Sequence, residues 1–203
     1  DIKIKFNTQL KFFKATDSIS RINEYGLTGC LTIHQSKFNN TSIEADGKNT
    51  NCEDVINLMK TIGQINQINI LNGSADGLDV DFSDIEIDLL SVEGAMNDCA
   101  DFSQGSYNVR FIIMQKCGDK GISVGEKSSF YGNKIKIDQS NIGISSKDSS
   151  KTFVNDFLTS NVNICAEAFQ KKQEFDGAEI TFLNIKCELN KFNVDNNSRI
   201  NEL

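Results

Sequence analysis

A repeat of 22 residues runs through the middle of this chain and limits its fold more than any other feature. Six five-residue segments align without a gap, and each begins 22 residues after the last: Asp54–Leu58, Asp76–Val80, Asp98–Phe102, Lys120–Val124, Ile142–Ser146 and Ile164–Ala168. A period of this length is typical of solenoid proteins. One repeat cannot bury its inner face alone, so stacked neighbours must form a continuous core.

The columns of this alignment alternate in polarity. Positions three and five are apolar or small in every copy, as in Ile56 and Leu58, whereas position four is polar, as in Asn57. Alternation with a period of two indicates a β-strand with one face inside. A second strand is predicted along Ile65, Ile87, Val109, Tyr131 and Phe153, and a less regular third near Ile70, Val92, Ile113 and Ile135. Three phenylalanines fall at predicted inward positions: Phe102, Phe153 and Phe157.

Short strands at a fixed period predict an all-β chain, folded as a single parallel β-helix with a 22-residue coil. Helical solenoids have periods of about 33–45 residues, and the frame of leucine-rich repeats is absent. A β-sandwich with chance periodicity is the alternative. We expect one domain over residues 1–203, with regular coils at about 50–190, less regular coils at 1–49 and a polar tail at 193–203. The first residue is Asp1, so we expect a processed chain or a domain of a larger protein.

Charge and composition exclude several function classes. The formal net charge of −7 argues against nucleic acid as a partner, because phosphate-backbone binding needs clustered lysine and arginine. No apolar run approaches the ~20 residues that cross a bilayer, so no membrane insertion is expected. The single histidine, His34, excludes a multi-histidine metal site within one chain. His34 itself is expected to be a packed or surface side chain.

The six cysteines form no CxxC pair, and the closest two, Cys99 and Cys117, are 18 residues apart. Zinc-ribbon and redox spacings are therefore missing. An even count permits disulfides, but Cys99 and Cys165 share a column with glycines, where small residues pack tightly. We predict reduced thiols buried in the core.

Several segments resemble successive coils of a bacterial family of right-handed parallel β-helix repeat proteins: Asp76–Ser83, Asn97–Ser103, Gly118–Glu126, Gly143–Ser150 and Phe169–Phe175. The resemblance covers about residues 50–185, and Gly118–Glu126 is its most specific part. It implies a right-handed helix and a bacterial origin. Some members accompany spore-coat-H-type kinase-like domains, and others occur in envelope or capsule settings. No signal peptide is visible, so the compartment stays open between bacterial cytoplasm and cell envelope. By fold analogy alone, pectate lyases and mannuronan epimerases are also similar.

Stacked aspartates form the first candidate site. Asp79 lies one coil from Asp101 in the outward column, and Asp76 lies one coil from Asp98. Neighbouring strands are about 4.8 Å apart, so one carboxyl pKa rises or a cation lies between the pair. Oxygen ligands suit calcium, so Asp76, Asp79, Asp98 and Asp101 are the candidate metal set, with Ca²⁺ as the only cofactor considered. The alternative is that these side chains accept backbone N–H groups at turns.

Lysines follow in the later coils. Lys120 occupies the column of Asp98, and Glu126 shares a column with Asp148. A lysine among carboxylates can abstract the proton next to a uronate carboxylate. The candidate catalytic set is therefore Asp79, Asp101, Lys120, Glu126, Lys147 and Asp148, and the candidate ligand-binding residues are Lys171 and Lys172. The alternative is a charge-compensated solvent-exposed face.

Three functions remain. The preferred one is a carbohydrate-associated module that binds or scaffolds a bacterial surface polysaccharide, since long solenoid faces suit extended polymers. Its partner would be the polysaccharide or another domain of the parent protein. The second is a polysaccharide lyase or epimerase acting on an acidic glycan. It would rely on lysine, because the three arginines, Arg21, Arg110 and Arg199, lie outside the shared segments. The third is a rigid structural element of a larger assembly. Whether the protein is an enzyme is left open.

Overall fold

The computed structural model describes residues 2–5, 12–14 and 27–203, and this part of the chain forms strands and no helix. Its strands are β1 (Ile2–Lys5), β2 (Phe12–Lys14), β3 (Gly29–His34), β4 (Lys37–Asp46), β5 (Asp54–Met59), β6 (Ile62–Gly73), β7 (Asp76–Asp81), β8 (Asp84–Ala95), β9 (Ala100–Ser103), β10 (Ser106–Gly125), β11 (Ser129–Lys147), β12 (Lys151–Phe169), β13 (Glu179–Cys187), β14 (Phe192–Val194) and β15 (Arg199–Glu202). The described residues contain no helix long and apolar enough to cross a membrane.

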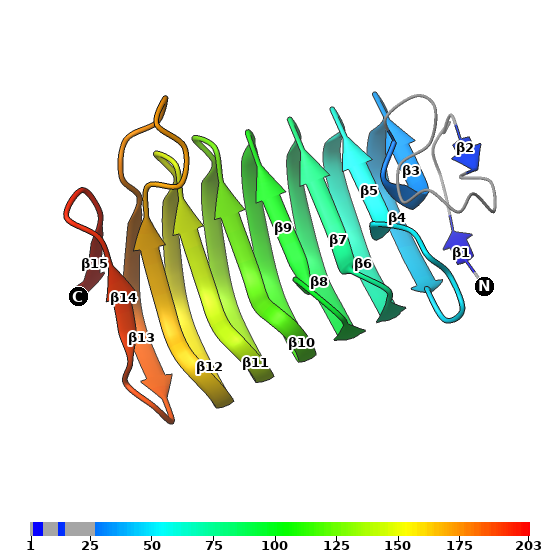
Figure 1. Cartoon of the computed structure of the whole chain (residues 1–203). Coiled ribbons are helices and arrows are strands. Elements are labelled where there is room, and N and C mark those ends of the chain that lie inside the picture. Colours follow the sequence, from blue (N-terminus) through cyan, green and yellow to red (C-terminus); the bar gives the residue numbers. More distant parts are fainter. Residues whose placement is uncertain (1, 6–11, 15–26) are drawn as a thin grey trace.

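The strands stack in parallel into a β-solenoid of about eight coils (Figure 1). A first stack contains β3, β5, β7, β9 and the C-terminal ends of β10–β12, followed by β14. A second stack contains β4, β6, β8, β10–β13 and β15. Only β1 and β2, among the described strands, pair antiparallel with their neighbours. The parallel β-helix and its 22-residue spacing are therefore confirmed, whereas its right-handed sense stays a prediction of the resemblance.

The first stack has the register that the repeat predicts. Leu78 pairs with Ala100 and Val80 pairs with Phe102, each 22 residues apart. Both inward columns are buried, and Phe102 is fully enclosed between the rings of Tyr107 and Phe130, with centroids 5.0 and 5.1 Å away. The core of the solenoid therefore lies between the two stacks. The core is continuous along the axis because the two inward columns are buried in each coil from β3 to β12.

The prediction for the second stack is wrong from β11 onward. The column of Ile65, Ile87 and Val109 continues into Gly132, not Tyr131, because Val109 pairs with a residue 23 positions away. The turn after Gly125 holds one extra residue, and Glu126 and Lys127 adopt left-handed φ values of 58° and 64° there. An irregularity between Cys117 and Lys120 restores the spacing of 22.

A shift of one residue exchanges the two faces of a strand. Tyr131 and Phe153 therefore point outward, and the inward prediction for Phe153 is wrong, whereas Phe102 and Phe157 are buried as predicted. Ile113 is 41% exposed, and Met114 takes the buried place between Val92 and Ile137. The predicted second and third strands are one long strand in each coil, as in β6.

The prediction of reduced cysteines is also wrong. All six are paired, as Cys30–Cys52, Cys99–Cys117 and Cys165–Cys187. The first and third pairs are 22 residues apart, which is one coil. Parallel stacking brings such residues within Cα–Cα distances of 5.4 and 6.0 Å, inside the range that a disulfide spans.

The ends of the chain are partly described. β3 and β4 form an early coil in which Leu31 and Ile33 are buried. The coils expected over residues 6–11 and 15–26 lie outside the described residues. The polar tail does not leave the stack: β14 pairs with β12, and β15 pairs with β13.

Candidate functional site

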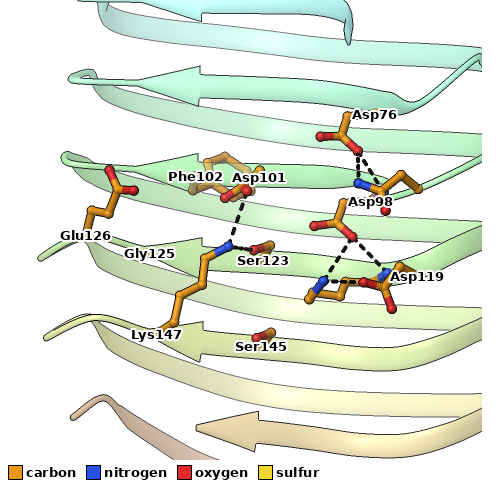
Figure 2. Close-up of polar contacts among 12 residues, drawn as sticks. Asp76, Asp98, Asp101, Phe102, Asp119, Ser123, Gly125, Glu126, Ser145 and Lys147 are labelled. Carbon is orange, nitrogen blue, oxygen red and sulfur yellow. Dashed lines mark hydrogen bonds and ion pairs between the residues drawn. The ribbon is translucent and has the colours of Figure 1, made fainter. Parts of the chain in front are cut away.

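Six aspartates cluster along the first stack, four of them partly exposed and two, Asp54 and Asp98, buried. We call this cluster the acidic face: Asp54, Asp76, Asp79, Asp81, Asp98 and Asp101. The structure places Asp79 beside Asp101 in register, and Asp54 beside Asp76. Asp98 precedes β9, and its backbone N–H donates to Asp76 Oδ1 at 2.9 Å (Figure 2). The two predicted aspartate pairs are therefore spatial neighbours.

Burial and mutual repulsion hold protons on this face. Burial, together with the charges of Asp54 and Asp81, raises the pKa of Asp79 to about 10. Burial and the charge of Asp76 raise the pKa of Asp54 to about 7, although a hydrogen bond with Thr28 opposes the shift. Asp79 is hydrogen-bonded to Asp81, whose pKa is also raised by burial. Burial and the neighbouring carboxylates therefore favour the protonated form of Asp79.

The candidate calcium set does not converge on one point. Asp76 Oδ1 accepts the side-chain N–H of Asn97 at 2.7 Å as well as the backbone N–H of Asp98. Asp98 Oδ1 accepts the backbone N–H of Lys120 at 3.1 Å. Within the described residues, no group of three or more His, Cys, Asp or Glu side chains is arranged to hold a metal ion. Oδ1 of Asp76 and Oδ1 of Asp98 thus act as turn acceptors, and the calcium site stays a prediction.

Two lysines neutralise separate parts of the acidic face (Figure 2). Lys147 Nζ donates to Ser123 Oγ at 2.8 Å and lies 3.5 Å from Asp101 Oδ2. Lys120 Nζ lies 3.4 Å from Asp98 Oδ1 and also contacts Asp119. Lys147 is only 8% exposed. Neither lysine is free to act on a ligand without first breaking an ion pair.

The remaining candidate residues anchor a loop. Asp148 is fully buried, and its Oδ1 accepts the backbone N–H groups of Lys171 and Lys172, both at 2.7 Å. The side chain of Lys172 pairs with Glu126, and Lys127 lies 5.5 Å over the ring of Phe175. These contacts fasten the segment after β12 to the turns after β10 and β11. The six candidate catalytic residues are therefore divided among separate local contacts, in the manner of a charge-compensated face.

A polar groove on the second stack was missed by the sequence reading. It has a volume of about 470 Å³, and we name it by its two rows of outward side chains: Gln64, Glu86, Asn108 and Tyr131 in one row, and Asn66, Asp88, Arg110 and Asn133 in the other. Gln64, Glu86, Asn108 and Tyr131 follow one another in strand register. The spacing of 22 between the first three was a visible signal. That spacing does not reveal Tyr131 as a groove residue, because the 22-residue alignment predicts an inward position for it.

Hydrogen bonds fix the polar groove along its length. Gln64 Nε2 donates to Glu86 Oε2 at 2.8 Å, and Arg110 Nε lies 3.1 Å from Asp88 Oδ1. At the far end, Asn155 Nδ2 donates to Asn133 Oδ1 at 2.8 Å and to Tyr131 Oη at 2.6 Å.

Tyr131 also stacks on Phe153, with ring centroids 5.6 Å apart and ring planes 4° from parallel. Tyr131 is 38% exposed. The polar groove therefore ends on a fixed aromatic surface.

Comparison of the chain with protein-family models, with curated proteins and with solved structures found no match.

Proposed function

We propose that this chain is a carbohydrate-associated module that binds a polysaccharide along the outer side of its second stack. The observation that carries the proposal is the polar groove with its aromatic end. Hydroxyl-rich ligands both donate and accept hydrogen bonds, and the groove offers amides, carboxylates and a guanidinium side by side. Tyr131 combines an apolar ring with a polar hydroxyl, which suits a sugar ring with C–H and O–H groups.

The repetition of the groove favours a polymer over a single sugar. Polar side chains recur at about 4.8 Å along the solenoid axis, so each successive unit of a long ligand meets a further set of hydrogen-bonding groups. The contacts between Gln64 and Glu86, and between Asn155 and Tyr131, hold these side chains in place before binding. Side chains that are already ordered lose less entropy when a ligand binds.

The proposed setting is a bacterial cell surface. Three disulfides support an oxidising compartment, because such bonds persist in secreted and envelope proteins and are rare in the cytosol. The bacterial origin, the envelope or capsule setting and the right-handed sense of the helix rest on the resemblance of the sequence segments. In the same setting, the rigid stack would also serve as a scaffold for another domain of the parent protein.

The test is incubation with a panel of acidic and neutral polysaccharides, measuring bound protein and polymer size together. The parent protein is expected to be retained by at least one polymer, and Tyr131→Ala should weaken that retention by about tenfold, the loss of one aromatic contact. Phe82→Ala is the matched control, because Phe82 is 51% exposed and lies outside the polar groove. Equal retention of both variants would contradict the proposal.

A lyase or epimerase remains the second candidate, on one observation. Burial and the charges of Asp54 and Asp81 raise the pKa of Asp79, and a carboxyl group with a raised pKa is a recurrent general acid. Against it, Lys147 is buried between Ser123 and Asp101 and offers little access to a substrate. Shortened polymer, new unsaturated ends or a changed sugar composition, abolished by Asp79→Asn, would establish this activity. Retention of unchanged polymer would support the binding module.

A further inference from the structure

A second groove, mostly apolar, lies beside the polar groove on the same stack. It has a volume of about 590 Å³, and we call it the lysine-lined groove. Its lining includes the apolar side chains of Phe111, Ile113 and Leu158 and the lysines Lys134, Lys136 and Lys186. Ile113 and Leu158 are each 41% exposed, which is unusual for large apolar residues grouped on one surface.

Within the described residues, no ion pair of 4.0 Å or less includes any of the three lysines, although the charge of Lys136 contributes to lowering the pKa of Asp138. Lys134 instead lies 6.0 Å over the ring of Phe111. The one acidic side chain of the groove, Asp156, accepts a hydrogen bond from Asn184 at 3.1 Å. The acidic face lies on the first stack, in β5, β7 and the β9 region, whereas these three lysines lie on the second stack, in the N-terminal part of β11 and in β13. The groove is therefore a cationic surface on an acidic protein.

Apolar and cationic side chains alternate along the solenoid axis in this groove. Strand register places Ile113 next to Lys136, Lys136 next to Leu158, and Leu158 next to Lys186. Neighbouring strands are about 4.8 Å apart, so each kind of side chain recurs at roughly 9.6 Å. A ligand that contacts both kinds of side chain must therefore repeat its own groups at roughly 9.6 Å.

The period distinguishes between extended ligands. An extended peptide repeats its side-chain face every ~6.6–6.8 Å, and an α-helix repeats every ~5.4 Å, so neither matches. An acyl chain carries no periodic charge. A pyranose ring in a linear polymer advances by about one strand spacing, so alternate sugars would meet alternate side chains.

From this match we infer that the lysine-lined groove binds a linear anionic glycan in which every second sugar carries a carboxylate. Carboxylates pair with Lys136 and Lys186, and the C–H faces of the intervening sugars contact Ile113 and Leu158. The inference rests on the proposed function and names its ligand class. Arg110 joins the two grooves: it lines the polar groove, and its guanidinium lies 4.9 Å over Phe111 of the lysine-lined groove. A glycan that lies beside Arg110 contacts both the polar groove and the lysine-lined groove.

The test compares Lys136→Gln/Lys186→Gln with the control Lys48→Gln/Lys60→Gln, which removes the same charge from exposed positions outside the groove. The probes are hyaluronan, in which a uronate alternates with a neutral amino sugar, and the same polymer with its carboxylates reduced to alcohols. The parent protein and the control should bind hyaluronan equally. The groove variant should bind it about tenfold more weakly and show a smaller salt dependence, since two ionic contacts are lost.

Each outcome has a separate meaning. If the parent protein binds both polymers equally and the groove variant loses nothing, the anionic class is wrong while the proposed function stands. If the parent protein binds no polysaccharide of the wider panel, the proposed function fails and this inference fails with it. If the groove variant loses binding only to phosphatidylglycerol vesicles, the groove is a membrane contact and the inference is overturned.

Discussion

Lys147 on β11 reaches back two coils to Asp101, with its Nζ 3.5 Å from Asp101 Oδ2 and 2.8 Å from Ser123 Oγ in the coil between. This contact joins three successive coils of the first stack through side chains alone. It is also the place where the acidic face meets a nearly buried cation.

Replacing Lys147 by Met should lower the free energy of unfolding by roughly 1–3 kcal/mol, because Asp101 then keeps a partly buried charge without a partner. The double variant Lys147→Met/Asp101→Asn should recover part of the loss. Urea denaturation of both variants and of Asp101→Asn completes a double-mutant cycle. A coupling free energy of zero would show that the ion pair adds nothing.

The acidic face should make the protein more stable as the pH falls from about 7 toward 4, opposite to ordinary acid denaturation. The pKa of Asp79 is about 10 in the folded state, against 3.8 for an ordinary aspartate, so in this window the folded state holds a proton that the unfolded state has lost. Stability from this proton is complete below the unfolded pKa and is lost as the pH rises toward the folded pKa. Asp54, with a pKa of about 7, acts in the same direction. Thermal unfolding across this pH range measures the slope.

Asp79→Asn should flatten that slope and raise the free energy of unfolding at pH 7 by roughly 1–3 kcal/mol, because it removes an acid that burial disfavours as an anion. The exposed Asp176→Asn is the control and should leave the slope unchanged. A parental slope that survives in Asp79→Asn would assign the effect to other groups.

Substitutions on the two faces of β10 test the register. Ile122→Asp should unfold the chain, since Ile122 is fully buried between Ala100 and Ile144 and the new charge would have no partner. Ile113→Asp, on the same strand but 41% exposed, should remain folded. Circular dichroism and size-exclusion chromatography distinguish the two. A folded Ile122→Asp would count against the inward column.

Calcium should leave the melting temperature unchanged, because one carboxylate oxygen of Asp76 and one of Asp98 already accept N–H groups. Differential scanning fluorimetry with millimolar CaCl₂ and with EDTA measures this directly. A rise of several degrees that disappears in Asp79→Ala/Asp101→Ala would restore the calcium hypothesis.

Loss of the Cys165–Cys187 disulfide, in the double serine variant, should lower the free energy of unfolding by about 2–4 kcal/mol. Peptide mapping without reduction should recover three disulfides. Six thiols titrating in denatured, unreduced protein would show that the pairing is absent.

The sequence was sufficient for the first stack because its segments carry no insertion between Asp54 and Ala168. Pairs such as Asp79 and Asp101 could therefore be placed before the structure was known. The second stack could not be placed so well. β11 has one extra residue in the turn after Gly125 and one fewer between Ser140 and Ile142 than β10 has between Cys117 and Lys120. The two changes cancel within the period, so the alignment of the first stack does not reveal the shift.

The sequence predicts where the aspartates of the candidate site lie, but not which groups their oxygens contact. Strand register brings Asp76 and Asp98 together, yet the N–H groups that their oxygens accept come from turn geometry that a period does not specify. The polar groove depends on Tyr131 facing outward, and that follows from the shifted register alone. The disulfides had a signal in the 22-residue spacing of Cys30 and Cys52, which was outweighed by the general preference of cysteine for burial.

The disulfides have a mechanical consequence. A stack of coils that contact only their neighbours can peel from either end, one coil at a time. Cys30–Cys52 and Cys165–Cys187 fasten adjacent coils close to the two ends of the stack, and Cys99–Cys117 lies between them. Tension along the axis would then meet covalent links where peeling of these coils would otherwise begin. The solenoid would then bear tension along its whole length until the contacts between the middle coils break.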